Sequence, residues 1–321
     1  MTALTTHLIA TVTVADPDVV GPLAVFPLIA TQARILRYRA FAQGGVTVHE
    51  LEEASVNDLL VNNALDVPVL LYEGEEVLGA QQNRTFDVSV LVPAGTELEV
   101  PVSCVEAQRW DGGRHEEAFT PAPQTAYPAL RRAKSERMRG RLAAGQEARA
   151  DQRAVWSMVA AKARRHGVAS PTGALHDVFA GHRDTLAALS SRIVARPDQV
   201  GMLAAIAGRF IVVDHISDPD AFAALHAPLV QGYALDAVEA KDTDPPSTDD
   251  ARQFLHGLSE ADFGGEARMN ATTGLGTLLP VVSPTASGTA LVNRGECITL
   301  TAFAAEEPRT HVRRPSRRRR G

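Results

Sequence analysis

Residues 74–84 contain side chains that could recognise a small ligand. Glycines at positions 74 and 79 let the backbone turn tightly or approach a ligand closely. The amide side chains can donate and accept hydrogen bonds, and a guanidinium can bind a carboxylate or phosphate through two parallel hydrogen bonds. The candidate ligand-binding residues here are Glu76, Gln82, Asn83 and Arg84. The same groups could instead bond to one another in a turn that locks two strands together.

Residues 106–110 form a second polar cluster. Arg109 is a second candidate anion clamp, and Trp110 could either stack on a base or ribose or cover the end of a sheet. If the protein is an enzyme, Glu106 and Glu75 are the candidate acid/base residues, a role that requires a carboxyl pKa near the working pH. The two clusters predict a site for a small anionic ligand. The alternative is a non-catalytic interaction or scaffold module in which the cluster is structural.

The strand pattern predicts that Arg84 and Glu106 lie close together. Apolar residues alternate along residues 84–92 and 98–106, and both charged residues share the apolar face. Opposite residues of a hairpin must lie on one face. A five-residue turn therefore places Arg84 opposite Glu106, and a three-residue turn places it opposite Cys104. In either register Arg84 lies beside Glu106 and, if the pair is half-buried, Arg84 would keep that carboxylate ionised.

Standard catalytic signatures are absent from the sequence, which has no P-loop, GxSxG, HExxH or CxxC motif. His115 has no second histidine at ligand spacing, so we expect no metal site, and nothing predicts a cofactor. Cys104 alternates in phase with apolar residues, which favours a buried thiol and no disulfide with Cys297. Asp214 and His215 could act as a base and its orienting group, but the polar edge of a strand fits the pattern better.

The surrounding sequence changes from strand-like to helical and back. Six short β-rich runs separated by turn residues predict an antiparallel β-sandwich or open barrel over residues 1–110. Residues 111–240 favour a mostly helical region with a β-hairpin at 202–213. A linker at 241–249 precedes a C-terminal helix and β-hairpin at 250–305, whose strands we expect to return to the N-terminal sheet. The predicted fold class is therefore α+β.

Three helix predictions rest on capping residues and apolar spacing. Residues 151–165 carry apolar residues at helical spacing. A second helix is expected directly behind an N-cap at Ser170, and a third is expected to begin at Ser217 or Asp218, before Pro219.

Composition and charge narrow the class of protein. The chain has 321 residues, of which 45% are hydrophobic and 22% charged, as in an ordinary globular protein. No apolar run reaches the ~18 residues of a membrane helix, so we expect a cytoplasmic protein. Residues 306–321 carry seven arginines and predict a disordered basic tail. This tail could make weak, non-specific contact with nucleic acid or another acidic partner. The oligomeric state is not predicted.

Two segments resemble a bacterial protein family. Residues 74–84 (GEEVLGAQQNR) and 101–110 (PVSCVEAQRW) are similar to the ADP-ribosylglycohydrolase (ARG) and rhodanese-phosphatase-superfamily-associated protein domain. The likeness covers roughly residues 21–303 and continues in three shorter segments: DQRAVW at 151–156, QVG at 199–201 and YALDA at 233–237. Gln81 and Ala107 depart from the expected residues, a lysine in the first case. The resemblance implies a nucleotide or ADP-ribose derivative as ligand and, if there is catalysis, a hydrolase or transferase.

Overall fold

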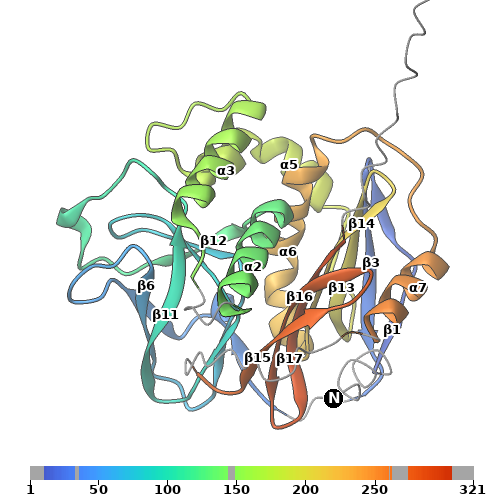
Figure 1. The fold of residues 1–321 in the computed structure, drawn as a ribbon, viewed down its shortest axis with the longest axis horizontal. Helices are drawn as coiled ribbons and strands as arrows, with labels where there is room; N and C mark the ends of the chain where they lie inside the picture. The colour runs from blue at the N-terminus through green and yellow to red at the C-terminus, as the bar shows by residue number, and fades with distance from the viewer. Residues whose placement is uncertain (1–10, 33–35, 144–148, 260, 262–273, 306–321) are drawn as a thin grey trace, which may run out of the picture.

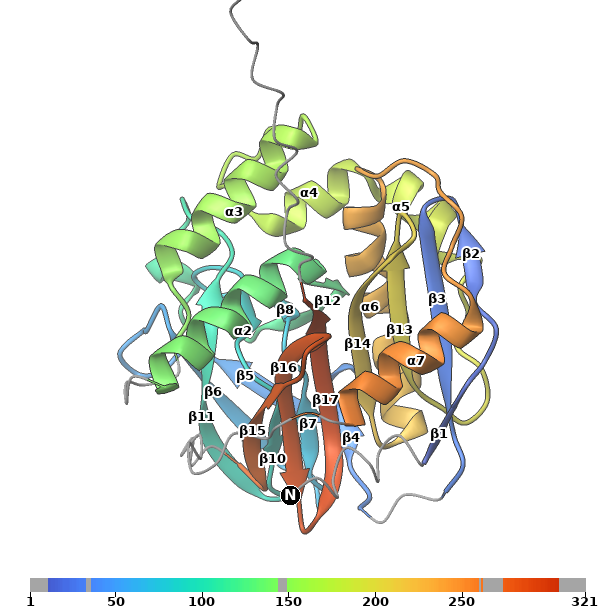
Figure 2. The same cartoon turned by 45° about the vertical axis from the view of Figure 1, so that its right-hand side comes forward.

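The structure is a computed structural model that describes residues 11–32, 36–143, 149–259, 261 and 274–305. The predicted basic tail at 306–321 lies outside these residues. Strands and helices are mixed along the chain, and the helices pack against three sheets (Figures 1 and 2). The α+β class is confirmed. Among the helices that the structure describes, none is both long and apolar enough to cross a membrane.

The largest sheet has eight strands in the order β1-β3-β13-β14-β17-β16-β15, with β2 beside β3. Its strands are β1 (Val12–Val14), β2 (Asp18–Val20), β3 (Leu23–Ala30), β13 (Gln199–Ile206), β14 (Arg209–Ile216), β15 (Thr277–Val282), β16 (Ala286–Asn293) and β17 (Glu296–Ala304). The predicted central hairpin is β13–β14, which turns at Ala207 and Gly208 with positive φ at both residues. Strand β17 pairs with β14, so the C-terminal strands return to the sheet that contains the N-terminal β3, as predicted.

The other N-terminal strands curl into a half-barrel made of two smaller sheets. One has the order β12-β8-β9-β11-β6-β5 and the other β10-β7-β4. Their strands are β4 (Arg39–Ala40), β5 (Val46–His49), β6 (Asp58–Asn63), β7 (Val69–Leu71), β8 (Glu75–Leu78), β9 (Arg84–Phe86), β10 (Val90–Val92), β11 (Thr96–Cys104) and β12 (Thr120–Thr125). The run predicted at 84–92 is split, because β9 pairs with β11 whereas β10 leaves to pair with β7. The first predicted run, β3, belongs to the large sheet.

The helices are α2 (Pro128–Ala143), α3 (Gln152–Arg165), α4 (Leu175–Gly181), α5 (Arg183–Ser190), α6 (Pro219–Ala237) and α7 (Thr248–Ser259), with short 3₁₀ helices η1 (Phe41–Gln43) and η2 (Gly112–Arg114). As predicted, α3 lies within residues 151–165 and α6 begins after Asp218; the N-cap of α3 is Asp151 and that of α6 is Asp218. The helix expected directly behind Ser170 begins later, at Leu175. The Ser170 hydroxyl accepts a hydrogen bond from the Ala174 amide, and residues 170–174 are not helical.

Helix α6 joins the two halves of the molecule. It is buried along most of its length and packs against β12 of the half-barrel and β13 of the large sheet. One apolar cluster therefore runs from Leu59 and Phe86 in the half-barrel, through Phe222 and Leu229 of α6, to Met202 in the large sheet. Burial of this continuous apolar surface stabilises the arrangement of the sheets.

Candidate functional site

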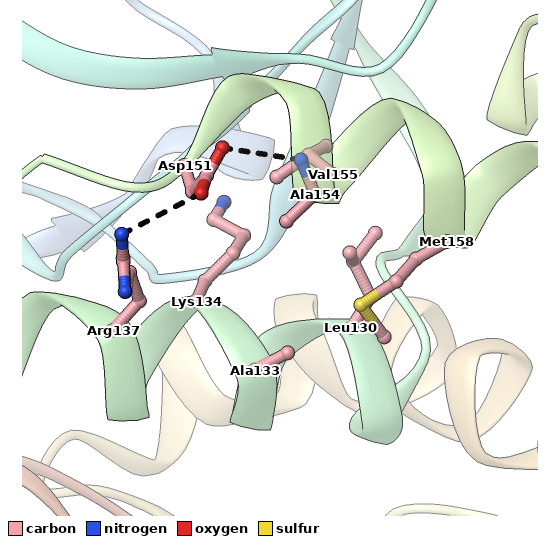
Figure 3. A pocket seen from close by; sticks show the side chains of 8 residues that line it. All are labelled: Leu130, Ala133, Lys134, Arg137, Asp151, Ala154, Val155 and Met158. Atoms are coloured by element: carbon pink, nitrogen blue, oxygen red, sulfur yellow. Dashed lines mark hydrogen bonds and ion pairs between the residues drawn. The ribbon is translucent and has the colours of Figure 1, made fainter.

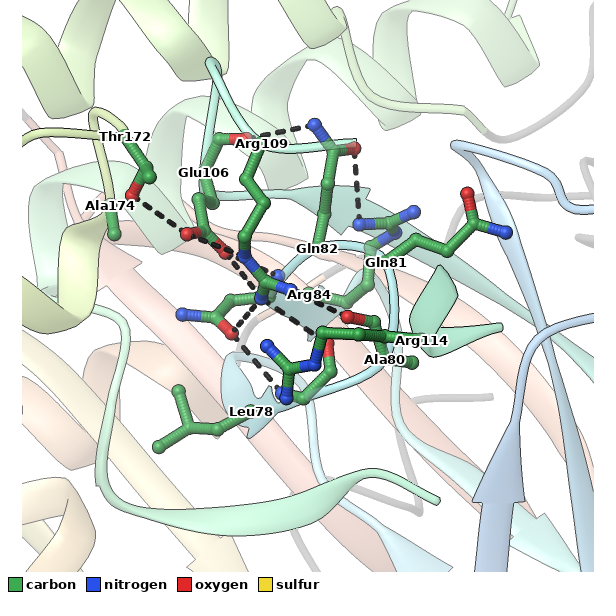
Figure 4. Close-up of polar contacts among 12 residues, drawn as sticks. Leu78, Ala80, Gln81, Gln82, Arg84, Glu106, Arg109, Arg114, Thr172 and Ala174 are labelled. Carbon is green, nitrogen blue, oxygen red and sulfur yellow. Dashed lines mark hydrogen bonds and ion pairs between the residues drawn. The ribbon is translucent and has the colours of Figure 1, made fainter. Parts of the chain in front are cut away.

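The predicted ligand segment forms the tight turn between β8 and β9. Gly79 and Ala80 both have positive φ, at 129° and 42°. The guanidinium of Arg109 donates hydrogen bonds to the carbonyl oxygens of Ala80 (2.5 Å) and Gly79 (3.3 Å) (Figure 4). The two polar clusters of the sequence therefore meet in space, because Arg109 holds the backbone of this turn.

Glu106 lies at the centre of this contact and is fully engaged. One carboxylate oxygen accepts hydrogen bonds from the Asn83 amide (3.0 Å) and Arg109 Nη2 (2.7 Å). The other accepts from Arg109 Nε (2.9 Å) and the Thr172 hydroxyl (2.7 Å). Burial alone would raise the pKa of Glu106, but the hydrogen bonds from Arg109, Thr172 and Asn83 bring it below its usual value. Glu106 is therefore ionised at neutral pH and has no proton to give as a general acid.

Arg84 is a buried cation with weak compensation. Its side chain is 0% exposed, and its nearest carboxylate oxygen is Glu50 Oε1 at 3.8 Å. Its hydrogen bonds are long, at 3.3 Å to Gln82 Oε1 and 3.5 Å to the Ser55 carbonyl oxygen. Its Nε has no partner among the described residues. The indole of Trp110 lies above the guanidinium, 5.7 Å from ring centroid to Cζ, and is 49% exposed.

Two buried acceptors beside Arg84 are also incompletely bonded. Glu50 Oε1 accepts from the Gln81 backbone amide at 3.3 Å, and the Gln81 side-chain nitrogen bonds to His115 Nδ1 at 2.8 Å. Glu50 Oε2 and Gln81 Oε1 have no partner within the described part of the chain. Burial raises the pKa of Glu50, although the charge of Arg84 opposes this. Glu50, Gln81 and Arg84 are called the Arg84 cluster below.

Residues 107–117 form a strap over the Arg84 cluster. The strap carries Trp110, its Asp111 amide donates to the Gln81 carbonyl oxygen at 3.3 Å, and His115 bonds to the Gln81 side chain. Gly112 and Gly113 lie between these contacts and are exposed. Arg109 ties the start of the strap to the turn, and beyond Arg109 the strap contacts Gln81 through Asp111 and His115 as it closes over a fully buried cation.

The register of β9 against β11 is the one that a three-residue turn predicts. Cys104 is opposite Arg84, and Val102 is opposite Phe86. Glu106 nevertheless takes Arg109 as its ion-pair partner, while Arg84 faces Glu50. Glu106 is ionised, but the arginine that lowers its pKa is Arg109, and the predicted pairing of Glu106 with Arg84 was wrong.

Glu75 and Glu76 have their hydrogen-bond partners away from the Arg84 cluster. Glu75 Oε2 accepts from the Tyr72 backbone amide at 2.6 Å, within the turn between β7 and β8. Glu76 Oε2 accepts from the Gln124 side chain at 2.6 Å. Burial raises the pKa of each carboxyl to about 8, and the charge of Glu106 adds to the effect at Glu76. Both are thus largely protonated at neutral pH, which is opposite to the state of Glu106.

Both cysteines are free and buried. The Cys104 thiol donates to Gln82 Oε1 at 3.2 Å, and burial raises its pKa, which agrees with the prediction of a core residue. The Gln152 side chain bonds to the Cys104 backbone nitrogen (2.9 Å) and oxygen (2.7 Å), as a neighbouring strand would. No three His, Cys, Asp or Glu side chains of the described residues are grouped so as to hold a metal ion.

Sequence reasoning missed a buried ionic network centred on Asp214. Arg131 donates two hydrogen bonds to its carboxylate, at 2.6 and 3.0 Å, and the hydroxyls of Tyr72 (2.6 Å) and Tyr233 donate as well. Burial would raise the pKa of Asp214, but Arg131 brings it below its usual value. Asp214 lies in the middle of the large sheet, so its interpretation as a polar strand edge was wrong. His215 points to the opposite face as a buried neutral residue whose pKa burial lowers to about 4.

A second buried ion pair starts from the same helix, α2. Lys134 Nζ contacts Asp87 (2.7 Å), the Thr85 hydroxyl (2.7 Å) and the Phe86 carbonyl oxygen (3.1 Å). The Ser103 hydroxyl also donates to Asp87, at 2.6 Å. With three acceptors, the ammonium of Lys134 is saturated, which indicates a structural role.

Two hollows flank α2, and neither contains a predicted site residue. A pocket of about 190 Å³ lies between α2 and α3 (Figure 3), lined by Leu130, Ala133, Lys134, Arg137, Asp151, Ala154, Val155 and Met158. Its charged groups have partners in the protein: Asp151 caps α3 and faces Arg137 at 3.7 Å. A groove of about 690 Å³ lies between α2, the end of β17 and the β13–β14 turn. These two hollows therefore lie apart from the candidate site residues.

Comparison with known proteins settles the family. A model of the ARG and Rhodanese-Phosphatase-superfamily-associated Protein domain matches residues 11–303. The chain belongs to this family. The resemblance seen in residues 74–84 and 101–110 is thereby confirmed. No curated protein and no solved structure matches the chain. The family name records an association with ADP-ribosylglycohydrolases and defines neither a ligand nor a reaction.

Proposed function

We propose that this ARG-associated domain is a bacterial cytoplasmic protein that binds a small anionic ligand of the nucleotide or ADP-ribose class. The ligand binds at Arg84, beneath Trp110, and the strap of residues 107–117 covers it. The family association with ADP-ribosylglycohydrolases supports this ligand class. If the bound ligand is also transformed, the reaction is a hydrolysis or group transfer in the same metabolism.

The observation that carries the proposal is the incomplete compensation of Arg84. A buried charge is costly unless it is paired and hydrogen-bonded. The Arg84 guanidinium has one carboxylate oxygen at 3.8 Å, two long hydrogen bonds and an Nε without a partner in the described chain. A phosphate or carboxylate would accept from the unused N–H groups in the planar geometry that arginine favours.

The proposal divides the predicted roles between the two arginines. Arg109 is occupied by Glu106 and by the backbone of the β8–β9 turn, so it positions the turn instead of clamping the ligand. Glu106 in turn is saturated by four donors and anchors Arg109. Gln82 and Asn83 orient Arg84 and Glu106, through the Gln82 amide oxygen and the Asn83 backbone amide. Trp110 is half exposed above Arg84, and a base of the bound ligand would stack on its indole.

A thermal-shift panel of AMP, ADP-ribose, adenosine and inorganic phosphate tests the proposal. A ligand at 100 times its dissociation constant adds about 2.7 kcal/mol of stability if it binds only the folded state. We expect a rise in melting temperature with AMP and ADP-ribose, and a smaller one with adenosine. Arg84→Gln should abolish the shifts, and Trp110→Ala, at an exposed position, should weaken the response to AMP.

The matched control is Arg252→Gln, which removes one exposed positive charge from α7, distant from the turn. It should respond to every ligand as the unmodified protein does. If no member of the panel raises the melting temperature, the proposal is overturned.

The second candidate function is a non-catalytic interaction module. It is favoured by the hydrogen bonds that Glu106 makes entirely within the protein. Asn83, Arg109 and Thr172 satisfy both oxygens of that carboxylate below the surface, as expected of a structural cluster. In that case Glu106→Gln lowers the melting temperature, and no ligand of the panel raises the melting temperature of the unmodified protein.

A further inference from the structure

We infer that the anion at Arg84 is the phosphate of a phosphorylated sugar, whose hydroxyl groups donate hydrogen bonds to Glu50 and Gln81. This inference rests on the proposed anion site and names the chemical class of its ligand. It predicts that the protein discriminates a sugar phosphate from a phosphate that carries no hydroxyl donors.

The composition of the Arg84 cluster favours a ligand with both acceptors and donors. Arg84 offers unused N–H groups, whereas Glu50 Oε2 and Gln81 Oε1 are acceptors without partners among the residues described. An inorganic anion or a dicarboxylate would satisfy the arginine only, and its charge would face the Glu50 carboxylate. Hydroxyl groups next to the phosphate would satisfy the two acceptors without adding charge.

The three groups belong to one connected patch. Glu50 directly follows β5, Gln81 lies in the β8–β9 turn, and Arg84 begins β9. The Gln81 backbone amide donates to Glu50 Oε1 at 3.3 Å, and the same oxygen lies 3.8 Å from Arg84 Nη2. All three side chains are 5% exposed or less. Glu50 therefore adjoins both the Arg84 guanidinium and the Gln81 backbone, which places the three residues next to one another.

The charges around the cluster argue against a ligand that contacts the two acceptors through an ammonium group or a metal ion. Glu50 is the only acid among these groups. Burial raises its pKa, and the positive charges of Arg84 and Arg109, and of His115 when that ring is protonated, oppose this rise. A second cation would be repelled by the guanidinium. A neutral hydroxyl group carries no such penalty. Hydroxyl donors would also favour the ionised form of Glu50, whose pKa burial raises in the unliganded protein.

Ligand entry requires the part of the strap beyond Arg109 to lift, while Arg109 keeps its bonds to the turn. The Asp111 amide and the His115 ring both bond to Gln81, and Trp110 lies over Arg84. A Cβ added to Gly112, at the middle of the strap, would meet no atom within 4 Å, so space remains around this residue. A site that must open first binds its ligand with an apparent affinity reduced by the fraction of open molecules.

Calorimetric titration with matched phosphates tests the inference. The ligands are ribose 5-phosphate, n-pentyl phosphate, which has no hydroxyl group on its chain, inorganic phosphate, and glycine as a zwitterion. Two hydrogen bonds of ordinary strength correspond to a difference in affinity of roughly thirtyfold. We expect ribose 5-phosphate to bind at least tenfold more tightly than pentyl phosphate and inorganic phosphate, and glycine not to bind.

Variants localise the discrimination. Gln81→Leu should weaken ribose 5-phosphate binding about tenfold and leave pentyl phosphate unchanged, whereas Gln81→Glu, which keeps an acceptor, should retain the preference for the sugar. Arg84→Gln should abolish binding of both phosphates. Circular dichroism and melting temperature establish that each variant is folded, and the ligand comparison on the unmodified protein does not depend on any variant.

The outcomes separate the inference from the function on which it rests. Equal affinities for ribose 5-phosphate and pentyl phosphate overturn the sugar-phosphate inference and leave the anion site standing. Binding of glycine in place of the phosphates also overturns it. If neither these phosphates nor AMP and ADP-ribose bind, the proposed function itself is wrong.

Discussion

Glu76 and Glu106 are buried carboxyls with opposite environments. Glu106 receives four hydrogen bonds, two of them from a guanidinium, and stays ionised. Glu76 receives one from the Gln124 amide, has an Oε1 without a partner in the described chain, and has a pKa of about 8. Adjacent carboxyls with separated pKa values occur in acid/base pairs of enzymes. Here all the hydrogen bonds to the ionised carboxylate, Glu106, come from the protein itself. The difference in pKa between Glu76 and Glu106 should therefore be measurable as an effect on the stability of the protein.

Replacing Glu76 with glutamine should stabilise the protein at alkaline pH and have little effect at acid pH. Folding raises the pKa of this carboxyl, so its contribution to stability is complete below about pH 4.5 and is lost as the pH rises towards 8. Glutamine mimics the neutral form at every pH. The difference in unfolding free energy between Glu76→Gln and the parent should grow by up to about 1.4 kcal/mol per pH unit within that window.

Urea unfolding at pH 4.5 and pH 8 measures this difference. Buried His215 and His226, which also change protonation in this range, are present in both proteins, so their effects cancel. A difference that is the same at both pH values would show that Glu76 is not protonated in the folded protein.

Elements with a polar cap or an apolar stripe could be predicted from the sequence, and α2 could not. Aspartates that cap α3 and α6 are local signals, and both helices begin where those signals lie. Helix α2 buries Leu130, Arg131, Lys134, Ser135 and Met138, which are spaced as one helical face. Three of these five are polar, and two of them, Arg131 and Lys134, bond to carboxylates and hydroxyls that are distant in the sequence. A pattern based on hydrophobicity therefore missed the helix and, with it, the network around Asp214.

The candidate site, like the helices, could be predicted only in part from the sequence. The two clusters at 74–84 and 106–110 meet because adjacent strands carry them, which alternation along the strands indicates. Glu50 was missed, because its contact with Arg84 depends on how β5 joins the sheet through β6, and no local pattern encodes that pairing. The division of β9 from β10 was missed for a similar reason, since β10 finds its partner in β7.

Two glycine-to-alanine substitutions should have opposite effects on element stability. A Cβ at Gly288 in β16 would lie 1.8 Å from the Thr301 carbonyl oxygen of the neighbouring β17, so Gly288→Ala must push these strands apart. A Cβ at Gly140 in α2 meets nothing within 4 Å. We expect Gly288→Ala to destabilise by several kcal/mol, or to prevent folding, and Gly140→Ala to stabilise by about 0.5–1 kcal/mol. Denaturant midpoints compare them, and a stable Gly288→Ala would contradict the tight pairing.

Across the whole molecule, α2 connects two sheets through buried ion pairs. Arg131 bonds to Asp214 in the large sheet, and three residues later Lys134 bonds to Asp87 after β9 of the half-barrel. Residues three apart lie on the same side of a helix. The helix thus fixes the position of one sheet relative to the other through charge pairing, in addition to the apolar contacts of α6.

A double-mutant cycle at Arg131 and Asp214 should reveal strong coupling. Asp214→Asn leaves the buried guanidinium with only the more distant Glu73 carboxylate, at 3.5 Å, and should lower the unfolding free energy by about 3–5 kcal/mol. Arg131→Met together with Asp214→Asn removes both charges, while the asparagine oxygen still accepts from the hydroxyls of Tyr72 and Tyr233. The double variant should therefore be less destabilised than the sum of the single variants. Additive losses in urea unfolding would mean that the pair does not act as a unit.

The position of Trp110 also makes the strap visible to fluorescence. The protein has two tryptophans, and Trp156 lies on α3 with its indole nitrogen buried, whereas Trp110 is half exposed above Arg84. In a Trp156→Phe background, all indole emission would come from the strap, and lifting it from the guanidinium would shift the emission spectrum. Stopped-flow mixing with a ligand could then time the movement. If the strap must open before the ligand binds, and opening is slow, the observed rate of the fluorescence change would level off at the rate of opening. Higher ligand concentrations would then not increase the observed rate.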